Sequence, residues 1–190
     1  MHIWIDIEKI EHVPFISAVV NELKVRGHVV ILTAPKSKKL SKVLENFNLT
    51  VHHIGKIISF FGLFLEFSTY MRTVVVLNYL KGRNINVAFS CGSKTMFLSC
   101  VDSGLPAILF VEDYKNRACK DFFLLKYGFF ILPDSIQDQS LIEAGFDLHL
   151  VAKYKGTIQL KNQSHDLKTV KEIVNKIEFL SQHLPGEITA

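Results

Sequence analysis

Apolar and polar residues alternate along this chain with two different periodicities. Short apolar runs rich in β-branched residues, such as residues 28–33, separate longer segments whose apolar residues recur every three or four positions. The short runs predict strands, and the longer segments predict amphipathic helices. The expected strands are residues 3–7, 28–33, 51–54, 86–90, 107–111, 129–132 and 149–151. The expected helices are residues 13–23, 37–47, 57–81 (with a break at Gly62), 93–103, 114–126, 135–144 and 166–184.

Strands and helices follow one another in regular alternation, which is typical of a parallel sheet covered by helices. The strand at 28–33 is almost continuously apolar, as expected when both of its faces are buried. Gly27 ends the first helix just before it, because glycine readily adopts a positive φ. We therefore predict an α/β fold: a doubly wound, mostly parallel, Rossmann-like sheet of about six or seven strands with right-handed crossovers.

The last thirty residues differ from the rest. Residues 161–190 contain a polar linker and then one amphipathic helix, for which Asp166 is the candidate N-cap. Its predicted apolar face consists of Leu167, Val170, Val174, Ile177 and Leu180. We expect this helix to pack on the domain formed by residues 1–160.

Composition narrows the class of protein. The chain has 190 residues, 48% of them apolar, and a net charge of +4, which suits one folded domain and gives little support for a nucleic-acid partner. No apolar run reaches the roughly 18 residues of a spanning helix. The N-terminus does not resemble a secretory signal, and the three cysteines have no CxxC spacing. We expect reduced, mostly buried thiols and a cytoplasmic protein.

Two common nucleotide motifs are missing. There is no GxGxxG after the first strand and no GxxxxGK[ST] anywhere, so a dinucleotide cofactor and a P-loop hydrolase are both disfavoured, and no cofactor is predicted. His52 and His53 are neighbours on a predicted strand and point to opposite faces, so they cannot readily share a metal ion. No metal site is predicted.

Ligands of parallel sheets bind beyond the carboxyl ends of the strands, where three loops carry candidate residues. Asp6 and His12 follow the first strand and could form an acid/base pair, although Asp6 could instead accept backbone hydrogen bonds and His12 could be an exposed helix-start residue. The turn Ser90-Cys91-Gly92-Ser93 opens a helix and could bind an anion through its N–H groups. Equally, it could be a small-residue turn with Ser93 as N-cap.

Three further features have two interpretations each. Cys91 could be a nucleophile or simply a small residue in a turn. Glu112 and Asp113 could bind a ligand or form a solvated loop. The very apolar segment Ile57 to Phe67, close in sequence to several lysines, could touch a membrane surface, or it could belong to the core or to a protein interface.

Several motifs together resemble the domain of unknown function 354 family, in order and in spacing, over about residues 1–160. The motifs are Trp4-Ile5-Asp6-Ile7, His12-Val13, Glu22-Leu23, Arg26-Gly27-His28-Val29, Ser90-Cys91-Gly92-Ser93, Gly104-Leu105-Pro106 and Tyr154-Lys155-Gly156. That family is similar to the N-terminal half of two-domain GT-B glycosyltransferases and of UDP-N-acetylglucosamine 2-epimerase. In such enzymes this half mainly binds the acceptor, and His12 lies where a His or carboxylate commonly acts.

This chain departs from the family pattern in two loops and in length. The opening loop has Glu8-Lys9-Ile10-Glu11 where the family has Asn-Pro and a second His. Glu112-Asp113-Tyr114-Lys115 is acidic but lacks the family's His. The second domain has no counterpart in these 190 residues.

The resemblance therefore implies a single-domain relative of the acceptor-binding domain. It would bind a carbohydrate or nucleotide sugar and act with a separate donor-binding subunit or as a homo-oligomer. The alternatives are a non-catalytic, degenerate domain that binds a ligand or partner, and a hydrolase that uses Cys91.

Overall fold

A single sheet of seven parallel strands forms the centre of the computed structural model, which describes residues 1–58, 62–115, 119, 122–125, 127–156, 158 and 165–182. The strands lie in the order β3-β2-β1-β4-β5-β6-β7, and every neighbouring pair is parallel. Their bounds are β1 His2–Asp6, β2 Val29–Ala34, β3 His52–His53, β4 Val87–Ser90, β5 Ala107–Phe110, β6 Gly128–Pro133 and β7 Val151–Tyr154. The predicted fold class is confirmed.

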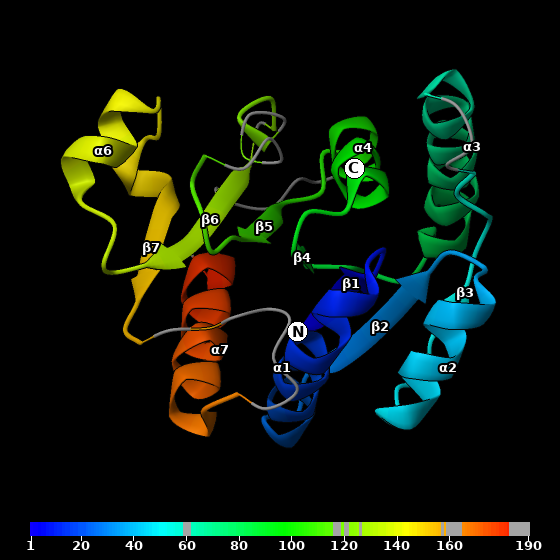
Figure 1. The fold of residues 1–190 in the computed structure, drawn as a ribbon, viewed down its shortest axis with the longest axis horizontal. Helices are drawn as coiled ribbons and strands as arrows, with labels where there is room; N and C mark the ends of the chain where they lie inside the picture. Colours follow the sequence, from blue (N-terminus) through cyan, green and yellow to red (C-terminus); the bar gives the residue numbers. More distant parts are fainter. Residues whose placement is uncertain are drawn as a thin grey trace.

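Helices cover both faces of this sheet (Figure 1). The helices α1, α2 and α7 share one apolar core, and α3, α4 and α6 contribute to a second core on the opposite face. Their bounds are α1 Val13–Val25, α2 Lys38–Asn46, α3 Gly62–Leu80, α4 Lys94–Ser103, α6 Asp138–Glu143 and α7 Leu167–Gln182. Two short 3-10 helices, η1 at Ile10–His12 and η2 at Leu148–Leu150, precede α1 and β7.

The two cores follow from the alternation of side chains along each strand. Ile3 and Ile5 of β1 enter the core on the α1 side, whereas Trp4 between them enters the core on the α3 side. In β4, Phe89 and Ala88 divide in the same way. Because both faces are covered, the strands read as continuous apolar runs rather than as alternating ones.

Local sequence signals account for several element ends. Ser37 and Ser93 are the N-caps of α2 and α4, and each side chain accepts a hydrogen bond from the N–H three residues later. Gly27, after α1, has a φ of +81°, and Gly104, after α4, has a φ of +69°. Both are conformations that favour glycine at a helix end.

The C-terminal helix packs where its amphipathic pattern predicts. α7 lies beside α1 and over β7, and it buries Val170, Ile173, Val174, Ile177 and Leu180. Asp166 accepts hydrogen bonds from the N–H and hydroxyl of Thr169, as expected of a cap. Leu167 differs from the prediction because, as the first residue of the helix, it is 62% exposed.

The start of α3 and the last strand differ from their predicted bounds. The sequence predicts helix on both sides of a possible break at Gly62 within residues 57–81, but α3 starts only at Gly62, and before it the N–H of Ile58 donates to the hydroxyl of Ser68. The last strand starts at Val151 rather than at 149, because residues 148–150 form η2. The predicted helix 114–126 lies in part outside the described residues, which here are 114, 115, 119 and 122–125. None of the helices in the described part of the chain is long and apolar enough to cross a membrane.

Candidate functional site

The order of the strands reverses between β1 and β4, and this is where open parallel sheets bind ligands. β2 and β3 lie on one side of β1, and β4 to β7 lie on the other. The loops that follow β1 and β4 therefore meet at the carboxyl edge of the sheet. They contain Asp6 with His12, and Ser90 with Ser93.

Asp6 forms the centre of a buried hydrogen-bond network. Its carboxylate accepts hydrogen bonds from the hydroxyls of Thr33 (2.5 Å) and Ser93 (2.6 Å) and from both terminal nitrogens of Arg72 (2.6 and 2.9 Å). The indole Nε1 of Trp4 extends the network by donating to Thr33 at 2.8 Å. The network thus joins β1, β2, α3 and α4 at the carboxyl edge.

Arg72 enters this network from the middle of α3. Its side chain is fully buried, and its Nε donates to the backbone oxygen of Ile54 at 2.9 Å. Burial alone would lower its pKa, but the charge and hydrogen bonds of Asp6, together with the charge of Glu8, raise the pKa above its ordinary value. Asp6 and Arg72 are therefore a paired charge of the kind that a protein interior tolerates.

The acid/base pair expected between Asp6 and His12 is not formed. Both oxygens of Asp6 are held by Thr33, Arg72 and Ser93, and in the described part of the chain no hydrogen bond joins Asp6 to His12. Asp6 does accept hydrogen bonds, but from side chains rather than from the backbone. In this arrangement the Asp6 carboxylate holds the side chains of Thr33, Arg72 and Ser93 in place.

Glu8 is a residue of this site that the motifs did not single out. Its carboxylate accepts hydrogen bonds from the N–H groups of Lys94 and Thr95, both at 3.1 Å, and from Arg72 at 3.3 Å. The carboxylate thereby occupies the positive N-terminal end of α4. One signal in the sequence pointed toward Arg72: it is the lone cation of a mostly apolar helix, where a buried charge needs a partner.

The turn at residues 90–93 already uses its own donors. The hydroxyl of Ser90 accepts from the N–H groups of Gly92 and Ser93, both at 2.9 Å, and the hydroxyl of Ser93 accepts from Met96 at 3.0 Å. Together with Glu8, these bonds satisfy five successive N–H groups, from Gly92 to Met96. An anion could reach these groups only by displacing Glu8 or the serine hydroxyls. Ser93 is an N-cap, as one of the two interpretations predicted.

His12 lies in the same loop, at the end of η1, and is only 8% exposed. The alternative of an exposed helix-start residue is therefore wrong. Burial, and secondarily the charge of Lys9, lowers its pKa to about 4, although Glu11 acts in the opposite direction. The imidazole is neutral at pH 7, and a neutral imidazole can accept a proton.

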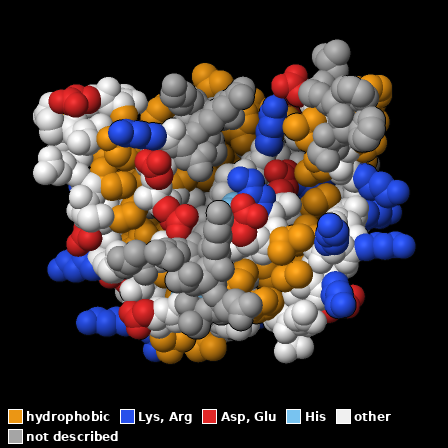
Figure 2. Space-filling view, viewed as in Figure 1, with side chains coloured by type: hydrophobic (Ala, Val, Ile, Leu, Met, Phe, Trp, Pro, Cys, Tyr) orange, Lys and Arg blue, Asp and Glu red, His pale blue; other side chains and the backbone are white. Residues whose placement is uncertain are grey.

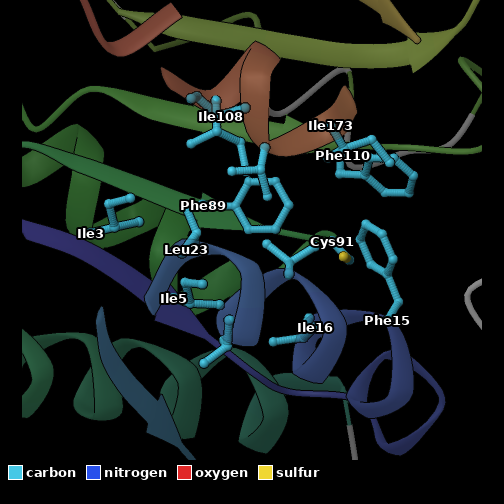
Figure 3. Close-up of a cluster of buried hydrophobic side chains, with 14 of the residues drawn as sticks. Ile3, Ile5, Phe15, Ile16, Leu23, Phe89, Cys91, Ile108, Phe110 and Ile173 are labelled. Atoms are coloured by element: carbon cyan, nitrogen blue, oxygen red, sulfur yellow. The ribbon is translucent and has the colours of Figure 1, made fainter. Parts of the chain in front are cut away.

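Cys91 is buried in the core on the α1 side. Figure 3 shows its sulfur facing Phe15 among apolar side chains. Burial, and then the charge of Glu112, raises the pKa of the thiol far above its ordinary value. The thiolate needed by a nucleophile is suppressed, and this disfavours a hydrolase based on Cys91. Cys100 and Cys119 are also free and buried, as expected.

The remaining candidates lie apart from this network. Glu112 and Asp113 are exposed after β5, and Asp113 accepts a hydrogen bond from the N–H of Lys115 at 2.9 Å, as in a turn. The ring of His52 lies 4.9 Å from that of Tyr79 at a tilt of 43°, whereas His53 faces Ser41 and Pro35. Within the described ranges, no three His, Cys, Asp or Glu residues are grouped closely enough to hold a metal ion.

Several solved structures share this fold. A glycosyltransferase from Rickettsia africae has a TM-score of 0.57 at 14% identity, over 83% of this chain and 43% of that structure. MurG from Acinetobacter baumannii has a TM-score of 0.56 at 16% identity, over 72% and 42%. A putative UDP-N-acetylglucosamine 2-epimerase from Listeria monocytogenes has a TM-score of 0.60 at 11% identity, over 79% and 43%. The chain therefore spans less than half the length of each of these structures.

Sequence comparison adds the family. A search of curated proteins gave no match. The family model described as "Protein of unknown function (DUF354)" matches residues 1–185, which is nearly the whole chain and extends beyond the range of the motifs. This match agrees with the resemblance inferred from the sequence and with the glycosyltransferase-like fold. The chain belongs to the DUF354 family.

Proposed function

We propose that this chain is the acceptor-side domain of a GT-B-like sugar transferase. The observation that carries the proposal is a buried, neutral His12 in the loop after β1, beside the point where the strand order reverses. The fold shared with the Rickettsia africae glycosyltransferase and with MurG supports the same interpretation. The expected ligand is a carbohydrate or nucleotide sugar.

His12 would act as the base in this reaction. Its neutral imidazole would take the proton of an acceptor hydroxyl while the acceptor oxygen bonds to the anomeric carbon of the sugar and the nucleotide leaves. Asp6 and Arg72 would not touch the substrate. They would act as positioning residues, because they hold the ends of β1 and β4 together around the loop that carries His12.

The donor would be held by a part that these residues do not form. We propose a separate donor-binding subunit or a second copy of this chain. Within the described residues, the N–H groups of the turn at 90–93 donate to the Ser90 hydroxyl, and those of the first turn of α4 donate to Glu8 and to the Ser93 hydroxyl. An additional phosphate there would have to compete with Glu8.

The test uses the chain together with the subunit that restores transfer. Replacing His12 by Ala should lower the rate at least about tenfold, as expected for loss of a general base. His149→Ala is the matched control, because His149 is exposed in η2 and should leave the rate unchanged. The rate should be level near neutral pH and fall as the pH drops through about 4, where His12 becomes protonated. An unchanged rate in His12→Ala would remove His12 from the mechanism.

A second candidate is a non-catalytic domain that binds a ligand or partner. The observation that favours it is that Asp6, Glu8, Ser90 and Ser93 are all engaged with one another or with the backbone. A thermal-shift screen of UDP- and dTDP-sugars separates the two candidates. A shift in melting temperature supports the transferase, whereas no shift together with a stable complex with another protein supports the binding domain.

A further inference from the structure

Over residues 64–75, the helix α3 has its apolar and polar faces reversed relative to a normal core helix. Its inward side contains Ser68, Thr69, Arg72 and Thr73, each at most 7% exposed, and only further along do Val76 and Leu80 join the apolar core. Its outward side carries apolar residues that are between 38% and 66% exposed: Phe64, Leu65, Phe67, Tyr70, Met71, Val74 and Val75. One exposed carboxylate, that of Glu66, lies among them and is paired with Lys94. Exposed apolar residues grouped on one face mark an interaction surface, whereas scattered ones do not. We call this group the α3 outer face.

The rotation of α3 about its axis is fixed, so the outer face cannot simply turn inward. Arg72 is tied to Asp6 through two nitrogens and to Ile54 through the third. A Cβ on Gly55 would come within 3.0 Å of the Arg72 side chain, so this side of the helix is in close contact with the chain before it. The hydroxyl of Ser68 also receives the N–H of Ile58.

A concentrated positive charge lies at the same end of the molecule. Residues 35–56, which form α2, β3 and their loops, contain five lysines and one glutamate. Without them the chain has 17 basic and 17 acidic residues, so this one segment accounts for its whole net charge of +4. All five lysines are exposed, and none of the ion pairs among the described residues involves them. They are Lys36, Lys38, Lys39, Lys42 and Lys56.

Four of these lysines surround a shallow hollow at the start of α2. Lys36, Lys38, Lys42 and Lys56 line it together with Ser37, Ser41, His53 and one carboxylate, that of Glu45. Figure 2 shows the basic side chains gathered at the α2–β3 end of the molecule, with hydrophobic side chains over α3 beside them. We call this hollow, with its four lysines, the lysine hollow.

We propose that the α3 outer face and the lysine hollow together form a docking surface for an anionic lipid bilayer. The lysines would contact phosphate headgroups while the aromatic and aliphatic side chains of α3 enter the boundary between headgroups and acyl chains. A second copy of this chain would cover the apolar face but would bring like-charged lysines close together. A nucleic acid would match the lysines but would leave the apolar face in water. This proposal is independent of any catalytic activity of the chain.

The proposed docking surface covers different residues from the apolar segment for which the sequence suggests membrane contact as one of two interpretations. The sequence points to Ile57 to Phe67, of which residues 59–61 lie outside the described part. The exposed face instead continues along α3 to Val75. Tyr70, Met71, Val74 and Val75 therefore join the surface, and Ser68 and Thr69 between them are turned away from it.

The experiment is co-sedimentation of the whole chain with vesicles of phosphatidylcholine, with and without phosphatidylglycerol. We expect binding only to the vesicles that contain phosphatidylglycerol, and weakening with added salt, because the lysine contribution is screened. The variant Lys38→Gln/Lys42→Gln should bind roughly tenfold or more weakly, since each lysine near an anionic surface contributes on the order of 1 kcal/mol. Its control is Lys168→Gln/Lys171→Gln on α7, which removes the same charge from exposed positions elsewhere.

A second pair of variants tests the apolar part. Phe67→Ser/Met71→Ser should reduce vesicle binding to a similar extent while leaving the circular dichroism spectrum unchanged, because both side chains are exposed. Leu167→Ser is its control on α7. Equal binding by the variants and controls, or no binding to either vesicle, would overturn the proposal. A concentration-dependent dimer that Phe67→Ser/Met71→Ser abolishes would overturn it too, and would assign the face to a second copy.

Discussion

The helices α7 and α3 are both amphipathic, yet they point their apolar sides in opposite directions. α7 turns its apolar residues onto α1 and the sheet, where Val170, Ile173 and Val174 are fully buried. α3 turns Phe67, Met71 and Val74 toward solvent and buries polar residues. The difference arises because hydrophobic burial along its whole length orients α7, whereas α3 is oriented by the buried ion pair of Arg72 together with the burial of Val76 and Leu80 near its end. A helix with a buried arginine can thus be held with its apolar side outward.

The largest effect should come from removing that ion pair. Arg72→Met leaves the Asp6 carboxylate buried without its cation, so the free energy of unfolding should fall by about 3–5 kcal/mol. Urea titration near neutral pH measures the loss. The double variant Asp6→Asn/Arg72→Met should recover part of it, because no unpaired charge then remains.

Arg83→Met is the control for this experiment. Arg83 follows α3, is exposed, and lies over the ring of Tyr79 at 4.0 Å, so its loss should cost less than about 1 kcal/mol. Similar small losses in Arg72→Met and Arg83→Met would show that something other than the ion pair orients α3.

A smaller loss of stability should distinguish a buried valine on α7 from an exposed valine on α3. Val174→Ala on α7 removes two methyl groups from a fully buried side chain and should cost about 2 kcal/mol in free energy of unfolding. Val74→Ala on α3 removes a side chain that is 46% exposed and should change the stability by no more than about 0.5 kcal/mol. Chemical denaturation of the two variants side by side makes the comparison. If Val74→Ala cost as much as Val174→Ala, the α3 outer face would be covered within the chain itself.

The contact between α7 and the end of α1 should contribute less still. Glu178 accepts hydrogen bonds from Arg26 and His28, both at 2.7 Å. Its partial burial tends to raise its pKa, but the bonds from His28 and Arg26 outweigh this and lower the pKa below its ordinary value. Glu178→Gln should therefore cost about 1 kcal/mol at neutral pH, because the contact is partly exposed to solvent.

The same carboxylate predicts a pH dependence with a definite sign. Because the folded protein has the lower pKa, the stabilisation is complete above the unfolded value of roughly 4.3 and is lost as the pH falls through the folded value. The wild type and Glu178→Gln should therefore converge in stability in acid. A difference that stayed constant from neutral to acidic pH would contradict this assignment.

The smallest change should be a gain in stability, from a substitution on the side of the sheet that α3 covers. Within the described residues, the hydroxyl of Ser99 on α4 is buried without a hydrogen-bond partner. Ser99→Ala removes that unsatisfied group and should raise the free energy of unfolding by about 0.5 kcal/mol, as a higher melting temperature would report. The matched control is Ser103→Ala, one turn further along the same helix. The Ser103 hydroxyl donates to the backbone oxygen of Ser99 at 2.7 Å, so its removal should bring no gain.

Most of the fold could be predicted because its determinants are local. The apolar strands, the caps at Ser37 and Ser93 and the glycine at position 27 each act within a few residues of the element they define. The start of α3 was predicted less well. The residues before it are mostly apolar, and Gly62 was interpreted as a break inside a longer helix rather than as the start of one.

The site was predictable only in part, because its bonds join distant positions. Asp6 and Ser93 were candidates as loop residues, but their direct bond spans 87 positions of sequence. Arg72 is 66 residues from Asp6, and no local pattern predicts that the two side chains pair. The apolar segment Ile57 to Phe67 left a membrane contact and burial in the core or an interface both open, and only the position of Arg72 shows which side of α3 faces inward.

The bonds of Glu8 to α4 have a consequence for the order in which the protein folds. They join residues 86 and 87 positions apart, so they can form only after β1 and β4 have paired. Closing so long a loop is slow compared with forming a helix. The first strand can thus be made early in synthesis, yet the loop carrying His12 acquires its final shape only when residue 95 has emerged and docked. The N–H groups of Lys94 and Thr95 should accordingly be among the last to gain protection in pulsed hydrogen exchange during refolding.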